Sequence, residues 1–130
     1  MIPNIERVLV LEDDLLLGVV LVAVLSSLGV DYVEHVRTVP EAFRELEEGG
    51  YDAVVVDLWI EGKRATSFLR AVDESGLPML VTSGFESGDV VRLVPKNAMF
   101  LQKPISTEQM RDALITLSSK GPDGAPDTRA

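Results

Sequence analysis

Three carboxylates in this sequence come directly after short runs of branched apolar residues. Glu12 and Asp13 follow the run Val8 to Leu11, and Asp57 follows Val54-Val55-Val56. A carboxylate at the end of a buried strand is costly unless it is paired. If the two runs are neighbouring strands, the three carboxylates would repel one another and raise one another's pKa. A hard divalent cation removes that repulsion, and Mg²⁺ prefers carboxylate oxygens, carbonyls and water, often together with a phosphate.

Two further residues would complete a site for phosphoryl transfer. Thr82 ends the apolar run that begins at Met79, and Lys103 comes just past the run Met99 to Leu101. A carboxylate such as that of Asp57 is a competent nucleophile in covalent catalysis. Phosphoryl transfer depends mainly on neutralising the charge of the phosphoryl oxygens. A cation and Lys103 would supply positive charge, and the hydroxyl of Thr82 would hydrogen-bond a phosphate oxygen.

Most of these residues also have a simpler structural interpretation. The run Glu12-Asp13-Asp14 could serve only to stabilise the positive end of a helix dipole. Lys103 alone would be an ordinary surface lysine, Thr82 a strand-end threonine in a turn, and Phe100 a core side chain. Asp57 is harder to explain in this way, because an aspartate after three valines would be buried and unpaired. The set as a whole therefore favours a functional site.

The elements that would position these side chains alternate between strands and helices. We expect strands over Val8 to Leu11, Tyr32 to Val36, Asp52 to Asp57, Met79 to Thr82 and Met99 to Leu101. We expect helices over Leu15 to Leu28, from the capping box at Thr38 and Glu41, over Lys63 to Glu74, and from the capping box at Ser106 and Gln109. A fourth helix within Gly84 to Asn97 would be short or irregular, because Pro95 interrupts it.

This alternation predicts an α/β fold, a flavodoxin-like (βα)5 doubly wound parallel sheet of five strands. If the strand order is 2-1-3-4-5, the polar residues at the strand ends converge in the crevice beyond the carboxyl edge of the sheet. His35 lies on an expected edge strand, and we assign it no role.

The first helix has two apolar sides. Leu17, Leu21, Val24 and Leu28 recur at spacings of four, three and four residues and predict its core stripe. Leu15, Val19 and Val22 lie on the opposite side, where a surface helix should be polar. Exposed apolar patches often mark interfaces, so we expect this patch to bind a partner. The alternative is that the tail of the chain covers it.

Length and charge limit the function further. The 130 residues predict one domain over residues 1–119 and a disordered tail, rich in Gly, Pro and Asp, over residues 120–130. The net charge of −9 argues against direct binding of nucleic acids. The most apolar stretch, Leu15 to Leu28, has 14 residues, whereas a membrane-spanning helix needs about 20. We therefore expect a cytoplasmic protein that does not enter a membrane.

Four segments together resemble the receiver domain of bacterial two-component response regulators. They are Val8 to Asp14, Val54 to Asp57, Leu80 to Ser83 and Phe100 to Pro104, and the resemblance extends from about Arg7 to Ser119. It implies a single-domain or hybrid-kinase-type receiver that catalyses only its own phosphorylation and dephosphorylation. Asp57 would then accept a phosphoryl group from a histidine kinase or a histidine phosphotransfer protein.

The resemblance also implies a set of metal ligands. Asp13 and Asp57 would bind Mg²⁺ directly, with Mn²⁺ as an alternative ion, and Glu12 would act mostly through water. The backbone carbonyl of Trp59 would be a further ligand.

The remaining site residues would bind the phosphate or respond to it. Lys103 would pair with the phosphate, and its bond to Pro104 would be cis. Thr82 would move toward the phosphate, and Phe100 would turn inward as a switch. In the family the first helix commonly docks on the helical bundle of the kinase. The patch of Leu15, Val19 and Val22 would therefore bind a kinase or a second copy of this chain.

The loop after Asp57 departs from the family pattern. The family usually has Met-Pro and a later Gly where this chain has Ile60-Glu61 and Ala65. A bulky indole at Trp59 could also shield an acyl phosphate from water. These departures leave open a pseudo-receiver that is never phosphorylated and acts only as a protein–protein interaction module.

Two other classes of protein with related chemistry fit the sequence poorly. A flavin-binding flavodoxin-like protein needs a hydroxyl- and amide-rich phosphate loop, whereas the loop Glu12-Asp13-Asp14 would repel a permanent phosphate. An aspartyl phosphatase of the dehalogenase-like type would need an acid two residues after the nucleophile, and that residue is Trp59.

Overall fold

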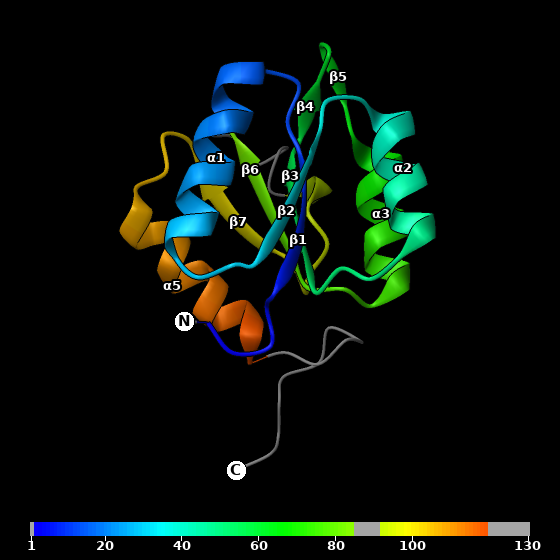
Figure 1. Cartoon of the computed structure of the whole chain (residues 1–130). Helices are drawn as coiled ribbons and strands as arrows, with labels where there is room; N and C mark the ends of the chain where they lie inside the picture. Colours follow the sequence, from blue (N-terminus) through cyan, green and yellow to red (C-terminus); the bar gives the residue numbers. More distant parts are fainter. Residues whose placement is uncertain (1, 85–91, 120–130) are drawn as a thin grey trace.

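Five parallel strands form the central sheet of the chain (Figure 1). The computed structural model describes residues 2–84 and 92–119. The strands are β1 (Arg7–Leu11), β2 (Tyr32–Val36), β3 (Ala53–Asp57), β6 (Met79–Ser83) and β7 (Met99–Gln102), in the spatial order β2-β1-β3-β6-β7. Because β6 and β7 are the fourth and fifth strands of this sheet, the predicted order 2-1-3-4-5 is confirmed.

Helices cover both faces of the sheet. They are α1 (Leu15–Ser27), α2 (Val39–Glu48), α3 (Thr66–Ser75) and α5 (Thr107–Ser118). Helices α1 and α5 lie on one face, and α2 and α3 lie on the other (Figure 1). The predicted fourth helix lies mostly outside the described residues, as does the predicted tail over residues 120–130. In the described part of the chain, no helix has the length and apolar character needed to cross a bilayer.

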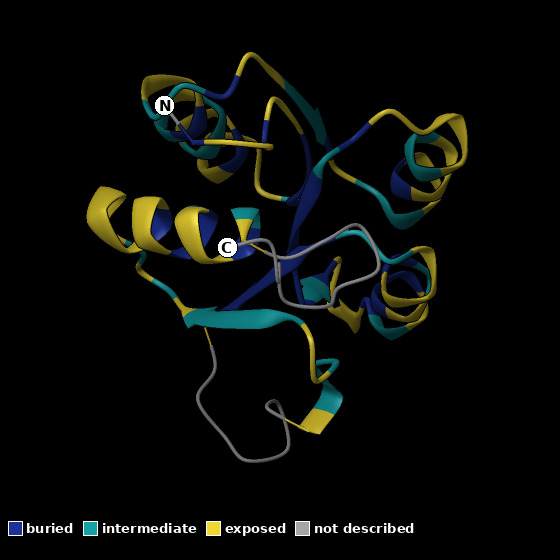
Figure 2. Cartoon of the chain, turned by 90° about the horizontal axis from the view of Figure 1, so that it is seen from below, coloured by how far each residue is buried: buried dark blue, intermediate teal, exposed yellow. Residues whose placement is uncertain are grey.

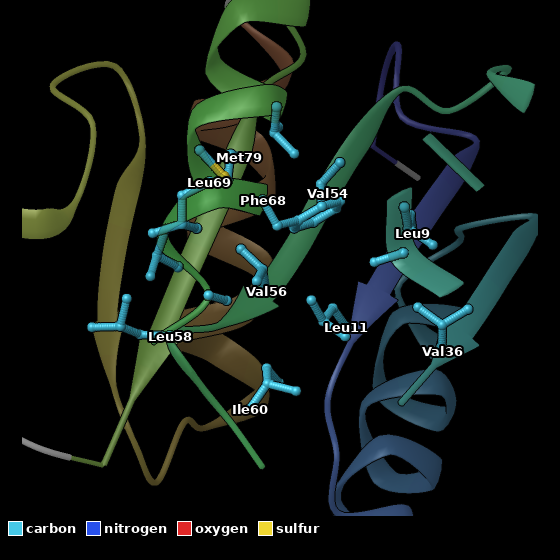
Figure 3. Close-up of a cluster of buried hydrophobic side chains, with 14 of the residues drawn as sticks. Leu9, Leu11, Val36, Val54, Val56, Leu58, Ile60, Phe68, Leu69 and Met79 are labelled. Atoms are coloured by element: carbon cyan, nitrogen blue, oxygen red, sulfur yellow. The ribbon is translucent and has the colours of Figure 1, made fainter. Parts of the chain in front are cut away.

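Side chains of each central strand alternate between the two layers of the core. On β1, Val8 and Val10 pack under α1 and α5, whereas Leu9 and Leu11 pack under α2 and α3. Figure 3 shows the second of these clusters around Phe68, which is fully buried. Burial of one such side chain stabilises the fold by about 1.5–3 kcal/mol. The central strands are apolar throughout because both of their faces are covered.

The helices turn one buried face to the sheet and one exposed face to solvent (Figure 2). Two of them begin at the predicted caps: the side chain of Thr38 accepts the backbone N–H of Glu41, and Ser106 and Gln109 form a reciprocal capping box. Asp14 is the N-cap of α1, and its carboxylate accepts the N–H of Leu17 at 3.0 Å.

The predicted core stripe of α1 is wrong at its first position. Leu17 is 42% exposed, and the fully buried residues of the helix are Gly18 and Leu25. The helix contains no charged residue between Leu15 and Ser27, so apolar residues lie on all of its sides. Their spacing therefore could not indicate which side faces the core.

The segment after Asp57 also differs from the prediction. Helix α3 begins at Thr66 and not at Lys63, because the preceding residues form an antiparallel hairpin of β4 (Trp59–Ile60) and β5 (Lys63–Arg64). The two turn residues, Glu61 and Gly62, have φ values of 53° and 77°. Positive φ at both positions is typical of the tightest hairpin turns, whose twist matches that of the strands.

Candidate functional site

The β4–β5 hairpin projects from the edge of the sheet at which the parallel strands end (Figure 1). Several polar residues stand at the strand ends of this edge. Glu12 and Asp13 follow β1, Asp57 ends β3, and Thr82 lies opposite Asp57 in the register of β3 and β6. Lys103 follows β7, where its backbone N–H donates to the carbonyl of Ser83 at 2.8 Å. The parallel order of the strands therefore brings residues from four segments of the chain to one place.

The carboxylates and the lysine form one compact cluster. One carboxylate oxygen from each of Glu12, Asp13 and Asp57 lies within 4.8 Å of the other two. The Lys103 Nζ atom donates to Glu12 Oε1 at 2.7 Å and to Asp57 Oδ2 at 2.8 Å. The ammonium thus neutralises part of the charge that three neighbouring carboxylates would otherwise leave uncompensated.

Burial and hydrogen bonding shift the pKa values of the residues in this cluster in different directions. Burial raises the pKa of Glu12, although the hydrogen bonds from Lys103 and from the Asp14 N–H oppose the shift. Burial is also the largest single influence on the pKa of Asp13 and acts to raise it, but the hydrogen bonds to this carboxylate together outweigh burial and the pKa is lowered. The strongest of these bonds comes from the N–H of Glu61, which donates to Asp13 Oδ2 at 2.8 Å. Burial acts to lower the pKa of Lys103, whereas the hydrogen bonds to Asp57 and Glu12 outweigh it and raise that pKa. Lys103 therefore stays cationic at neutral pH.

The backbone fixes the orientation of Asp57. The N–H of Trp59 donates to Asp57 Oδ1 at 3.0 Å, so the two carboxylate oxygens have different partners. The neighbouring Leu58 N–H donates to the carbonyl of Thr82 at 2.9 Å and ties this turn to β6. The Trp59 ring lies under the guanidinium of Arg64, 5.3 Å from the ring centroid, which joins the two strands of the hairpin.

The other residues predicted from the sequence lie on β6, on β7 and directly after β7. Thr82 is buried, and Phe100 is half-buried against the core under α2 and α3. The peptide bond between Lys103 and Pro104 is cis.

Known proteins that resemble this chain were found among solved structures only. No family model matches the chain, and no curated protein matches it. In contrast, 276 chains of solved structures match. A response regulator receiver protein from Sinorhizobium medicae WSM419 is 21% identical, with a TM-score of 0.79, and the match covers 88% of this chain and 95% of that one.

Two further solved structures show the same similarity. The receiver domain of the sensor histidine kinase PA1611 from Pseudomonas aeruginosa PAO1 is 26% identical, with a TM-score of 0.73, over 87% of this chain and 97% of that one. That structure has a magnesium ion coordinated in the active-site cleft. The beryllofluoride-activated NtrC4 receiver domain dimer is 24% identical, with a TM-score of 0.72, over 84% and 93% of the two chains. The chain has the fold of response-regulator receiver domains.

In this receiver fold the acidic cluster suits a divalent cation. Three carboxylate oxygens from two loops are the hard ligands that Mg²⁺ prefers. Asp13 also lines an open cleft of about 510 Å³ together with Arg37, Thr38, Glu41 and Glu61, so one side of the cluster is accessible from solvent. The donor set and its access therefore fit such an ion.

Two residues that were assigned no role from the sequence contact the acidic loop of this receiver fold. His35 Nε2 lies 2.8 Å from the carbonyl oxygen of Glu12, and Arg37 Nε donates to the carbonyl of Asp13 at 3.0 Å. His35 lies on β2, the edge strand beside β1, and Arg37 is the residue directly after β2. The predicted strand order already placed the end of this strand beside the acidic loop, and that was the available signal.

The apolar patch on α1 is broader than predicted and is shifted on the helix. Leu15 and Val19 are 55% and 54% exposed, whereas Val22 is half-buried. Leu16, Leu17 and Val20 are exposed as well. We refer to Leu15, Leu16, Leu17, Val19 and Val20 as the α1 patch.

Proposed function

We propose that this chain is a two-component receiver that accepts a phosphoryl group on Asp57 from a histidine kinase or a histidine phosphotransfer protein. The reaction depends on Mg²⁺, and the phosphorylated domain, residues 1–119, changes conformation to control the binding of a partner. The observation that carries this proposal is the cluster of Glu12, Asp13 and Asp57 with Lys103 bonded to the Asp57 carboxylate at 2.8 Å.

The residues of the cluster divide the work of phosphoryl transfer. An oxygen of Asp57 attacks the phosphorus of the donor's phosphohistidine, the O–P bond forms, and the P–N bond breaks. The imidazole nitrogen of the donor leaves with the electron pair and takes up a proton. The Trp59 N–H orients the carboxylate, and the Lys103 ammonium neutralises a phosphoryl oxygen. Glu12, Asp13, Asp57 and the Trp59 carbonyl would hold the Mg²⁺ ion, which supplies further positive charge to the phosphoryl group.

The proposed switch uses two adjacent strands. The Thr82 hydroxyl moves toward the new phosphoryl group on Asp57, its neighbour across the β3–β6 pairing. Phe100 lies on β7 opposite Val81, one residue before Thr82, so a displacement of β6 reaches Phe100 directly. Phe100 then turns inward and changes the surface that a partner contacts.

The α1 patch is the proposed surface for partners. Helix α1 has no charged residue, and its solvent-exposed side is apolar. Exposed apolar surfaces of this kind often mark protein–protein interfaces. It would dock on the helical bundle of the phosphate donor or on a second copy of this chain. The net charge of −9 makes nucleic acid an unfavourable direct partner. We place the protein in the cytoplasm, where its phosphate donors would be.

Beryllofluoride with Mg²⁺ tests the phosphorylation chemistry, because the complex mimics a phosphoryl group on a carboxylate. We expect it to raise the thermal midpoint of the wild-type protein and to leave Asp57→Asn unchanged. The variant keeps the size of the side chain and removes only the nucleophilic carboxylate, so it is a matched control. An equal shift in both proteins, or none in either, would contradict the proposal.

A pseudo-receiver that only binds other proteins is the second candidate. The hairpin from Trp59 to Arg64 favours it, because this hairpin lies beside Asp57 where the sequence departs from the receiver pattern. A wild-type protein that does not respond to beryllofluoride would support this candidate.

A further inference from the structure

Three hydrogen bonds hold the loop that carries Glu12 and Asp13 to the end of the edge strand β2 and to Arg37, the residue after it. The N–H of Glu12 donates to the carbonyl of Val36 at 3.1 Å and continues the β1–β2 pairing by one residue. Beyond that point side chains replace the backbone: His35 Nε2 contacts the carbonyl of Glu12 at 2.8 Å, and Arg37 Nε donates to the carbonyl of Asp13 at 3.0 Å. The two carbonyls belong to the residues whose side chains form the acidic cluster.

The contact of His35 has a defined direction. A carbonyl oxygen can only accept, so the Nε2 atom of His35 carries the proton that it donates to Glu12. Glu12 is 1% exposed and its carboxylate accepts a hydrogen bond from Lys103, so both its backbone and its side chain are held in place. Loss of the His35 bond would leave the carbonyl of this buried residue without that partner.

Helix α1 makes room for this ring at one position. A Cβ atom on Gly18 would lie 1.9 Å from His35 Cε1 and 2.1 Å from His35 Nε2. No side chain larger than hydrogen can occupy position 18 while the ring stays in place. Gly weakens a helix relative to Ala, yet here it is a buried residue of a helix otherwise built from Leu, Val, Ala and Ser. The absence of a side chain at Gly18 therefore leaves the space that the His35 ring occupies between α1 and the acidic loop.

We propose that His35, seated against Gly18, is a positioning residue that sets the backbone of the acidic loop for cation binding. This inference rests on the proposed function, since it concerns the same Mg²⁺ site. His35 does not contact the ion or the phosphoryl group. It acts through the carbonyl of Glu12, and it fixes where the Glu12 and Asp13 carboxylates stand relative to Asp57. Partners of this outer kind typically change metal affinity about 10- to 100-fold when they are removed.

Mg²⁺ titration, followed by the fluorescence of Trp59, tests the proposal in the full chain. Trp59 is the single tryptophan and lies beside Asp57. We expect His35→Phe, which keeps a ring against Gly18 but cannot donate, to weaken Mg²⁺ binding about tenfold. His35→Gln, whose amide can donate again, should recover most of the affinity. Gly18→Ala should weaken binding to a similar extent, because it displaces the ring while His35 itself is retained.

A second readout separates positioning from a merely structural role. In metal-free protein, the backbone amide NMR signals of Glu12 and Asp13 should move in His35→Phe and Gly18→Ala and return toward the wild-type positions in His35→Gln. Equal Mg²⁺ affinity in wild type and His35→Phe would overturn the proposal, even if the variant were less stable. A wild-type protein that binds no Mg²⁺ would instead contradict the proposed function. The amide signals would then decide the role of His35 alone, and unchanged signals would overturn it.

Discussion

At the scale of residues, three consecutive acidic side chains do three different things. Asp14 caps α1, Glu12 is buried against Lys103, and Asp13 accepts the N–H of Glu61 from the hairpin. The interpretation of this run as a helix N-terminus therefore holds for Asp14 only. The opposite pKa shifts of Glu12 and Asp13 follow from their surroundings, because burial dominates for the first and hydrogen bonding for the second.

The raised pKa of Glu12 predicts a pH-dependent loss of stability in metal-free protein. The unfolded side chain releases its proton near 4.5, whereas the folded one keeps it to higher pH. Over this window the folded state binds more protons, so the free energy of unfolding falls as pH rises. Glu12→Gln cannot titrate and does not suffer this loss. We expect its stability relative to wild type to increase from pH 4.5 toward neutral, measured by urea denaturation with a chelator present.

Asp13→Asn supplies a contrast of opposite sign. Because the pKa of Asp13 is lowered from 3.8, its contribution to stability is complete above that pH and is lost as pH falls below it. The advantage of wild type over Asp13→Asn should therefore shrink only in acid. If Glu12→Gln showed the same trend as Asp13→Asn, burial would not control the charge of Glu12.

At the scale of elements, the sequence predicted the strands that are marked by apolar runs and the helices that are marked by N-cap residues. The apolar runs marked all five central strands, and Thr38 and Ser106 marked two helix starts. The core side of α1 was not predictable, because this helix has no charged residue and its two serines stand together at its C-terminal end, so its faces show little contrast in polarity. The hairpin was missed because Glu61-Gly62 lies between runs of only two paired residues, too short for a pattern of alternation.

The α1 patch predicts self-association that one charge should abolish. We expect the wild-type protein to sediment faster as its concentration rises and Val19→Glu to sediment as a monomer throughout. Val19 is 54% exposed, so the substitution should change the free energy of unfolding by no more than about 0.5 kcal/mol. A wild-type protein that remains monomeric at every concentration would exclude the second copy as the occupant and leave the phosphate donor.

A matched control adds the same charge to the opposite layer of the fold. Ser67→Glu, an exposed position on α3, should self-associate as the wild type does. Loss of self-association in both variants would indicate an effect of net charge and not of the α1 patch.

At the scale of the whole molecule, strand order builds the site. Glu12, Asp57 and Lys103 are far apart in the sequence, and the order β2-β1-β3-β6-β7 makes their strand ends converge. The sequence indicated these residues because each follows an apolar run. It could not indicate that Lys103 bonds to both Glu12 and Asp57, nor that His35 reaches the loop carbonyl, because those contacts depend on side-chain geometry across strands.

The most direct test of the account is phosphorylation by a small donor with a P–N bond. Phosphoramidate and Mg²⁺ are added to the purified chain, and the site of modification is located by mass spectrometry. We predict that one phosphoryl group is attached to Asp57, and that none is attached in Asp57→Asn or when a chelator removes the metal. A chain that stays unmodified, or one that is modified equally in Asp57→Asn, would contradict the account.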